Sequence, residues 1–123
     1  MKKKLLIIED EKTLLSILVD KFTNEDFQVI TAVNGKEGLF SAIKNHPDII
    51  LLDIIMPVMD GMTMLEELRK DSWGKTASVI LLTNLSDSEK VFKSSKQGVV
   101  DYLIKCDMAL DDVVKRVKKK LAS

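Results

Sequence analysis

Short apolar runs alternate along this chain with longer stretches in which apolar residues recur every three or four positions. The runs predict strands at 4–9, 28–32, 48–53, 78–83 and 100–105. The longer stretches predict helices at 12–25, 36–44, 62–71, 87–97 and 109–121. Regular alternation of this kind favours an α/β fold, in which helices cover both faces of a doubly wound, five-stranded parallel sheet.

The run from Ile49 to Leu52 is the most apolar segment, which predicts a central strand buried on both faces. Four of the helices are expected to turn one apolar stripe towards the sheet, whereas the helix over 87–97 is less hydrophobic. In chain order, the residues expected on these stripes are Leu14, Leu15, Ile17, Leu18, Phe22, Leu39, Phe40, Ile43, Met62, Leu65, Leu68, Leu110, Val113, Val114, Val117 and Leu121.

Length and charge restrict the kinds of protein that this chain can be. Its 123 residues fit a single domain over 1–123, with no output domain attached. Lysine and arginine total 19, as do aspartate and glutamate, so the net charge gives no reason to expect direct contact with nucleic acid. One cysteine, no signal-peptide core and no apolar run of about 18 residues indicate a cytoplasmic protein without membrane insertion.

Polar residues close four of the apolar runs. The strands predicted at 4–9, 48–53, 78–83 and 100–105 end at or beside Asp10, Asp53, Thr83 and Lys105. Because open parallel sheets bind ligands at the carboxyl ends of their strands, we expect these side chains to meet at one edge. Carboxylates, with Glu9 beside them, a hydroxyl and an ammonium suit Mg²⁺ and a phosphoryl group.

Asp53 has two candidate roles at such an edge. Its carboxylate can bind the cation, or it can attack phosphorus and become an acyl phosphate. Lys105 would supply a point charge, while the Thr83 hydroxyl and the Asn84 backbone N–H would bind phosphoryl oxygens. The acids after the first strand also have a purely structural interpretation, in which Asp10 or Glu11 caps the following helix.

Four segments carry a resemblance to a known family. They are Ile8-Glu9-Asp10, then Leu52-Asp53-Ile54-Ile55-Met56-Pro57-Val58-Met59-Asp60-Gly61, then Leu81-Leu82-Thr83, and finally Asp101-Tyr102-Leu103-Ile104-Lys105. Together they resemble the receiver domain of bacterial two-component response regulators, over essentially the whole chain from Lys4 to Leu121. The resemblance implies a flavodoxin-like fold similar to that of chemotaxis regulators, with strand order 2-1-3-4-5 and five helices.

The resemblance also implies a phosphoacceptor signalling domain rather than an enzyme. Asp53 would accept a phosphoryl group from the phosphohistidine of a histidine kinase, or from a small phosphodonor. Asp10, Asp53 and the carbonyl of Ile55 would bind Mg²⁺ directly, with Glu9 acting through the water shell of the metal. Lys105 would bind phosphoryl oxygens and assist the transfer.

A switch and a set of partners are implied in the same way. On phosphorylation Thr83, which also binds the phosphoryl group, would move inward and Tyr102 would turn into the vacated space. This would change the surface formed by the fourth helix, the last strand and the last helix, which would bind a downstream protein. A histidine kinase or phosphotransfer protein would act upstream. The chain would be a monomer or a weak phosphorylation-dependent dimer with contacts from Asp101, Asp111 and Lys115.

Four positions differ from the usual pattern of the family. Asn84 stands where relatives carry a smaller residue, so we expect it to narrow access to the phosphoryl group. Ile55 and Leu85 are apolar where relatives line the path of the attacking water, which predicts slow autodephosphorylation. Cys106 replaces the usual proline after Lys105, which leaves open whether that peptide bond is cis or trans.

Other protein classes fit the residues less well. Phosphatases that form an aspartyl phosphate usually carry an acid/base aspartate at the position of Ile55. A flavin-binding protein of similar topology would need a Ser/Thr/Gly-rich loop where this chain has Asp10-Glu11-Lys12. The alternatives to a stand-alone receiver are a receiver that is part of a larger regulator and an interaction module that is never phosphorylated.

Overall fold

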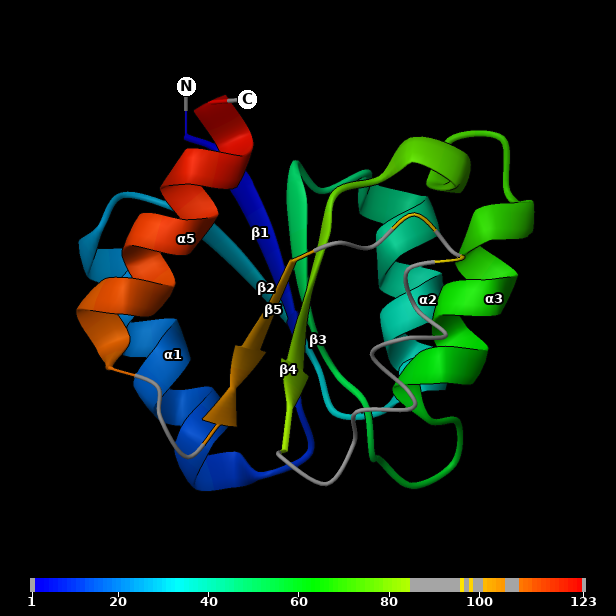
Figure 1. Cartoon of the computed structure of the whole chain (residues 1–123), viewed down its shortest axis with the longest axis horizontal. Helices are drawn as coiled ribbons and strands as arrows, with labels where there is room; N and C mark the ends of the chain where they lie inside the picture. Colours follow the sequence, from blue (N-terminus) through cyan, green and yellow to red (C-terminus); the bar gives the residue numbers. More distant parts are fainter. Residues whose placement is uncertain (1, 85–95, 97, 99–100, 106–108, 123) are drawn as a thin grey trace.

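The computed structural model of the chain describes residues 2–84, 96, 98, 101–105 and 109–122. Five parallel strands form one sheet in the order β2-β1-β3-β4-β5, as the resemblance implied (Figure 1). The strands are β1 (Lys4–Ile8), β2 (Gln28–Ala32), β3 (Ile49–Asp53), β4 (Val79–Thr83) and β5 (Asp101–Ile104). Their bounds lie within one residue of those predicted.

Helices cover both faces of the sheet. In Figure 1, α1 (Lys12–Asn24) and α5 (Leu110–Ala122) lie on one face, and α2 (Gly35–Asn45) and α3 (Gly61–Lys70) lie on the other. A short 3-10 helix, η1 (Gly74–Thr76), lies between α3 and β4. The described residues therefore hold four α-helices rather than five, because the helix expected over 87–97 falls almost wholly outside them. No described helix is both long and apolar enough to cross a membrane.

Strand β3 lies at the centre of the sheet, and all five of its residues are buried. Because successive side chains of a strand point to opposite faces, β1 and β3 contribute to two cores. Leu5 and Ile49 pack with α1 and α5, whereas Leu6 and Ile50 pack with α2 and α3. Burial of each such side chain contributes about 1.5–3 kcal/mol, so the apolar run of β3 stabilises both layers at once.

The orientation of α2 differs from the prediction. The sequence predicts that Phe40 and Ile43 face the sheet, but Phe40 is 68% exposed and Ile43 is 39% exposed, so the prediction is wrong for both. The buried positions of this helix are Gly35, Gly38 and Ala42. A Cβ atom at Gly38 would clash with the side chain of Ile8. The helix therefore lies so close to β1 that only small residues fit between them.

The other helices mostly bury the predicted stripes. In α1, Leu18 and Phe22 are fully buried, but Ile17 is exposed, so that prediction is wrong. The remaining predicted stripe residues are buried or packed, partly exposed, against one of the two cores: Leu14, Leu15, Leu39, Met62, Leu65, Leu68, Leu110, Val113, Val114, Val117 and Leu121.

Candidate functional site

The sheet brings the predicted site residues to one edge, which is the lower edge in Figure 1. Asp53 ends β3 and Thr83 ends β4, while Asp10 lies two residues after β1 and Lys105 directly follows β5. The four strands are adjacent and parallel, and their registers align Ile8 of β1 with Leu52 of β3. The prediction that these strand ends converge is therefore confirmed for the backbone.

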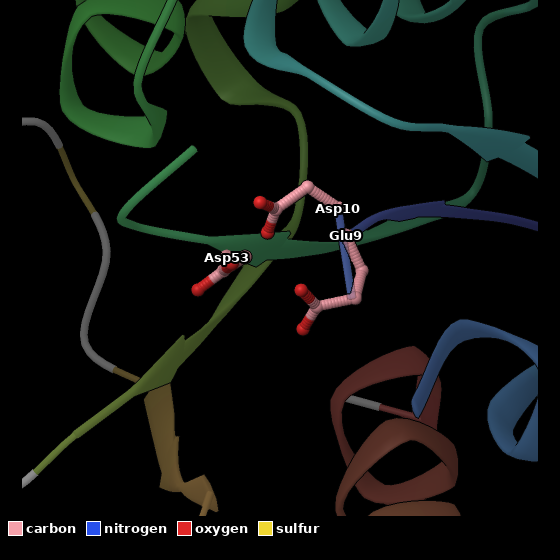
Figure 2. A group of neighbouring side chains, drawn as sticks. All are labelled: Glu9, Asp10 and Asp53. Atoms are coloured by element: carbon pink, nitrogen blue, oxygen red, sulfur yellow. The ribbon is translucent and has the colours of Figure 1, made fainter. Parts of the chain in front are cut away.

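Three carboxyl groups meet at this edge. One oxygen each of Glu9, Asp10 and Asp53 lies within 4.8 Å of the other two, and Figure 2 shows Asp10 and Asp53 directed towards the same locus. Glu9 and Asp53 are buried, whereas Asp10 is exposed. Hard oxygen ligands at this separation, with one side open to water, suit a divalent cation such as Mg²⁺.

Lys105 links two of these carboxylates. Its Nζ lies 2.8 Å from Oε1 of Glu9 and 3.1 Å from Oδ1 of Asp53, and its side chain is only 17% exposed. Three carboxylates and one ammonium leave a formal charge of −2 in this cluster when all are ionised. A bound divalent cation would neutralise that charge, so the donor set fits the metal ion that the resemblance implies.

The pKa of Asp53 is raised in these surroundings. Burial, followed by the neighbouring carboxylate of Glu9, raises the pKa of Asp53 to about 7, and the ammonium of Lys105 offsets part of this rise. Burial lowers the pKa of Lys105, but the carboxylates of Glu9 and Asp53 raise it more, so the net shift is upward. Without a cation, the folded protein therefore favours the protonated form of Asp53 more than the unfolded chain does.

Glu9 is held by both of its carboxylate oxygens. Oε2 accepts a hydrogen bond from the backbone N–H of Glu11 at 3.1 Å, while Oε1 faces Lys105. Glu11 occupies the N-cap position of α1, but its own side chain accepts no capping hydrogen bond. The capping interpretation of this acidic segment is therefore wrong for Glu11. The pairing of Glu9 with Lys105 was not predicted, although an acid directly after a buried strand signals the need for a cationic partner.

The predicted switch residues differ in exposure. Thr83 is buried, and its hydroxyl donates a hydrogen bond to the backbone carbonyl of Asn84 at 3.1 Å. Tyr102 is 45% exposed, and its backbone carbonyl accepts a hydrogen bond from Arg116 at 3.4 Å. Asn84 is exposed, and Leu85 and Cys106 lie outside the described residues, as does the Lys105–Cys106 peptide bond.

The turn between β3 and α3 is fixed tightly against the site. Asp60 caps α3 by accepting a hydrogen bond from the backbone N–H of Thr63 at 2.8 Å, and the N–H of Gly61 donates to the carbonyl of Ile54 at 2.7 Å. A Cβ atom at Gly61 would clash with the backbone carbonyl of Asp53. Glycine at this position therefore lets the first turn of α3 lie directly against the end of β3.

The same turn contains a strained residue that the sequence did not indicate. Val58 has φ = 69°, and the N–H of Met59 donates across it to the carbonyl of Pro57 at 2.8 Å, which closes a γ-turn. A β-branched residue rarely adopts a positive φ. Ile55, whose carbonyl is the predicted metal ligand, has a side chain that is 52% exposed on this turn.

Comparison with known proteins agrees with the fold and with the family that the sequence resembles. The family model described as "Response regulator receiver domain" matches residues 5–118. The "Probable transcriptional regulator ycf27" of Porphyridium aerugineum is 33% identical over 96% of this chain and 50% of its own length. The chain thus spans about half the length of that relative.

Two solved structures have nearly the same backbone. A putative response regulator from Chloroflexus aurantiacus superposes with a TM-score of 0.90 at 30% identity, covering 100% of both chains. The CheX–CheY–BeF3–Mg²⁺ complex from Borrelia burgdorferi contains a chain with a TM-score of 0.85 at 30% identity, covering 95% of this chain and 87% of that one.

Proposed function

Because the chain belongs to the response regulator receiver domain family, we propose that it works as a phosphoacceptor switch in which Asp53 is the accepting residue. Receiver domains are signalling domains of two-component systems rather than enzymes in the usual sense. The observation that carries the proposal is the buried carboxylate of Asp53 at the end of the central strand, 3.1 Å from Lys105 and clustered with Glu9 and Asp10.

The transfer step follows from these positions. An oxygen of Asp53 attacks the phosphorus atom of a phosphohistidine, the P–N bond breaks, and the released ring nitrogen keeps the bonding electron pair and takes up a proton. Lys105, already beside Asp53, stabilises the negative charge on the phosphoryl oxygens. A small phosphodonor such as acetyl phosphate would react in the same way, with its own leaving group departing from phosphorus.

Mg²⁺ is the cofactor in this proposal. Asp10, Asp53 and the carbonyl of Ile55 would hold it directly, and Glu9 would act through its water shell. When bound, the cation supplies positive charge that compensates for the acidic cluster and the incoming phosphoryl group. The donor set on which this rests is the group of three carboxylates within 4.8 Å, and the Borrelia burgdorferi CheX–CheY complex contains Mg²⁺.

Thr83 and Tyr102 form the switch. The Thr83 hydroxyl would exchange its hydrogen bond to the carbonyl of Asn84 for one to a phosphoryl oxygen, and the exposed ring of Tyr102 would then turn inward. The partners would be a histidine kinase or phosphotransfer protein upstream and a target protein downstream. Residues 1–123 would act as one cytoplasmic receiver, either alone or within a longer regulator.

The free protein would be a monomer. Asp111 lies 2.8 Å from Lys21 of α1, and Asp101 lies 2.8 Å from Lys120 of α5, so both acids already pair within the chain. These are the acids that the sequence offered for contacts across a dimer interface. Ion pairs at a protein surface contribute little, so a phosphorylation-dependent dimer would need other contacts as well.

Intact-mass spectrometry tests the proposal directly. The protein is incubated with acetyl phosphate and Mg²⁺, and we expect a gain of one phosphoryl group that hydroxylamine removes, as it does from acyl phosphates. The gain should disappear with Asp53→Ala and with a chelator, but persist in the control Asp112→Asn, which changes an exposed acid of α5. No gain with either acetyl phosphate or a competent kinase would overturn the assignment of Asp53.

A further inference from the structure

The outer face of α2 carries large apolar side chains that the core does not use. Phe40 is 68% exposed and Ile43 is 39% exposed, while the positions buried against the sheet are Gly35, Gly38 and Ala42. Gly38 faces Ile8 of β1, and Phe40, two positions further along, lies on the opposite side of α2 from that contact. Neither the core nor the proposed phosphoryl site accounts for an exposed phenylalanine here.

These side chains line a groove of about 370 Å³ along one face of the helix. Its described lining consists of Lys36, Leu39, Phe40, Ile43 and Lys44. The spacing of i, i+3, i+4, i+7 and i+8 places all of them on one side of a helix, with apolar residues in the middle and a lysine at each end. Lys44 also lies 5.8 Å from the centre of the Phe40 ring.

We propose that this groove docks an acidic amphipathic helix of a partner protein, separately from the phosphoryl site. An apolar stripe on the incoming helix would cover Phe40 and Ile43, and glutamate or aspartate one turn to either side would pair with Lys36 and Lys44. The acid on this part of α2, Glu37, is not among the residues that line the groove, and its carboxylate accepts a hydrogen bond from Nδ2 of Asn34 at 3.0 Å. The groove therefore presents positive charge around an apolar centre.

Charge also favours this partner over two other possible occupants of the groove, a second copy of α2 and an anionic membrane. Lys36 and Lys44 lie four residues on either side of Phe40, so a second copy of α2 packed about Phe40 would place lysine against lysine in either direction. An anionic membrane would attract the lysines, but two lysines and one ring fall short of the several basic residues that surface binding requires. A helix with acids flanking its apolar residues satisfies both features of the groove.

A titration followed by ¹H–¹⁵N correlation spectra tests the proposal. The probe is a designed helical peptide with a leucine stripe flanked by glutamates, and its control is a scrambled peptide of the same composition. We expect a Kd below about 1 mM, with the largest amide shifts over residues 35–45. Phe40→Ala should weaken binding about tenfold or more, since the ring is the largest apolar contact, and Lys36→Glu should weaken it about threefold or more.

Matched variants separate docking from loss of structure. Ile17→Ala removes an apolar side chain of α1 that is about as exposed as Ile43, and Lys75→Glu reverses an exposed lysine in η1. Both variants should change the Kd less than about twofold. Lys36→Glu adds an acid to the first turn of α2, which the helix dipole favours, so weaker binding cannot come from a destabilised helix.

Four results would overturn the proposal. The first is that the designed peptide does not bind, and the second is that the scrambled peptide binds equally well. The third is that the amide shifts are centred away from α2, and the fourth is that the control variants lose as much affinity as Phe40→Ala and Lys36→Glu. Sedimentation must also show a monomer at the concentrations used, and vesicles containing anionic lipid must not bind the protein. A dimer or a vesicle complex that Phe40→Ala abolishes would assign the groove to that occupant instead.

Discussion

The metal-free protein should lose stability as the pH rises from about 4 to 7, because the folded state holds a proton on Asp53 that the unfolded chain releases. Burial, followed by Glu9, raises the pKa of Asp53 from 3.8 to about 7. Between these values the folded state binds more protons than the unfolded state. The contribution of Asp53 is therefore fully present below a pH of about 4 and is lost as the pH rises through about 7.

The size of the effect follows from the shift. At 1.36 kcal/mol for each pKa unit, the difference between 3.8 and about 7 corresponds to about 4 kcal/mol as an upper value. Because Lys105 can adjust towards an ionised Asp53 and the Asp10 side of the cluster is open to water, we expect about 1–3 kcal/mol to be realised.

Asp53→Asn isolates this contribution, since an amide resembles the protonated acid in shape and never ionises. Urea unfolding in EDTA, followed by circular dichroism, should give a variant about 1–3 kcal/mol more stable than wild type at pH 8. The difference in stability between the two proteins should narrow as the pH falls and should close near pH 4. Asp112→Asn, at an exposed acid, should follow wild type throughout. A less stable Asp53→Asn at pH 8, or a gap that is constant with pH, would refute the reasoning.

Four other substitutions test separate parts of the structure. Lys105→Met should destabilise the metal-free protein by about 2–4 kcal/mol at pH 8 and by less at pH 5, as measured by urea unfolding. The reason is that the buried carboxylates of Glu9 and Asp53 lose the ammonium group that pairs with them. Gly61→Ala should cost about 2 kcal/mol or more in the same assay, because its Cβ meets the end of β3. Val58→Gly should raise the unfolding free energy by about 1 kcal/mol, since it relieves a positive φ at an exposed side chain. Asn84→Ala should speed phosphorylation by acetyl phosphate, measured by intact mass over time; an unchanged rate would show that this side chain does not restrict access.

The strands were predictable from the sequence because their apolar runs are short, continuous and closed by polar residues. Ile49 to Leu52 has no polar face, and only a strand covered on both sides buries such a run. The order of the strands was not contained in these runs, since any parallel arrangement would bury them. That order came from the resemblance, whose specific motif surrounds Asp53.

The face of α2 could not be read from apolar periodicity. Phe40 and Ile43 form a regular stripe, but Gly38 and Ala42 form another, and periodicity favours the larger side chains. The distance between α2 and β1 decides between them, because the helix approaches Ile8 too closely for a larger residue. That distance is a property of the packed layers and not of the helix sequence alone.

The pairing of Glu9 with Lys105 would give the proposed switch a second route from the site to the surface. Lys105 follows β5 directly and lies three residues after Tyr102, while its ammonium is shared between β1 and β3 through Glu9 and Asp53. A phosphoryl group on Asp53 would add oxygens that compete with Glu9 for this ammonium. Only Ile104 stands between Lys105 and Leu103, which packs against the core. Any shift of Lys105 would therefore displace the end of β5. Tyr102 would thus respond to the charge on Asp53 through Lys105 as well as through Thr83.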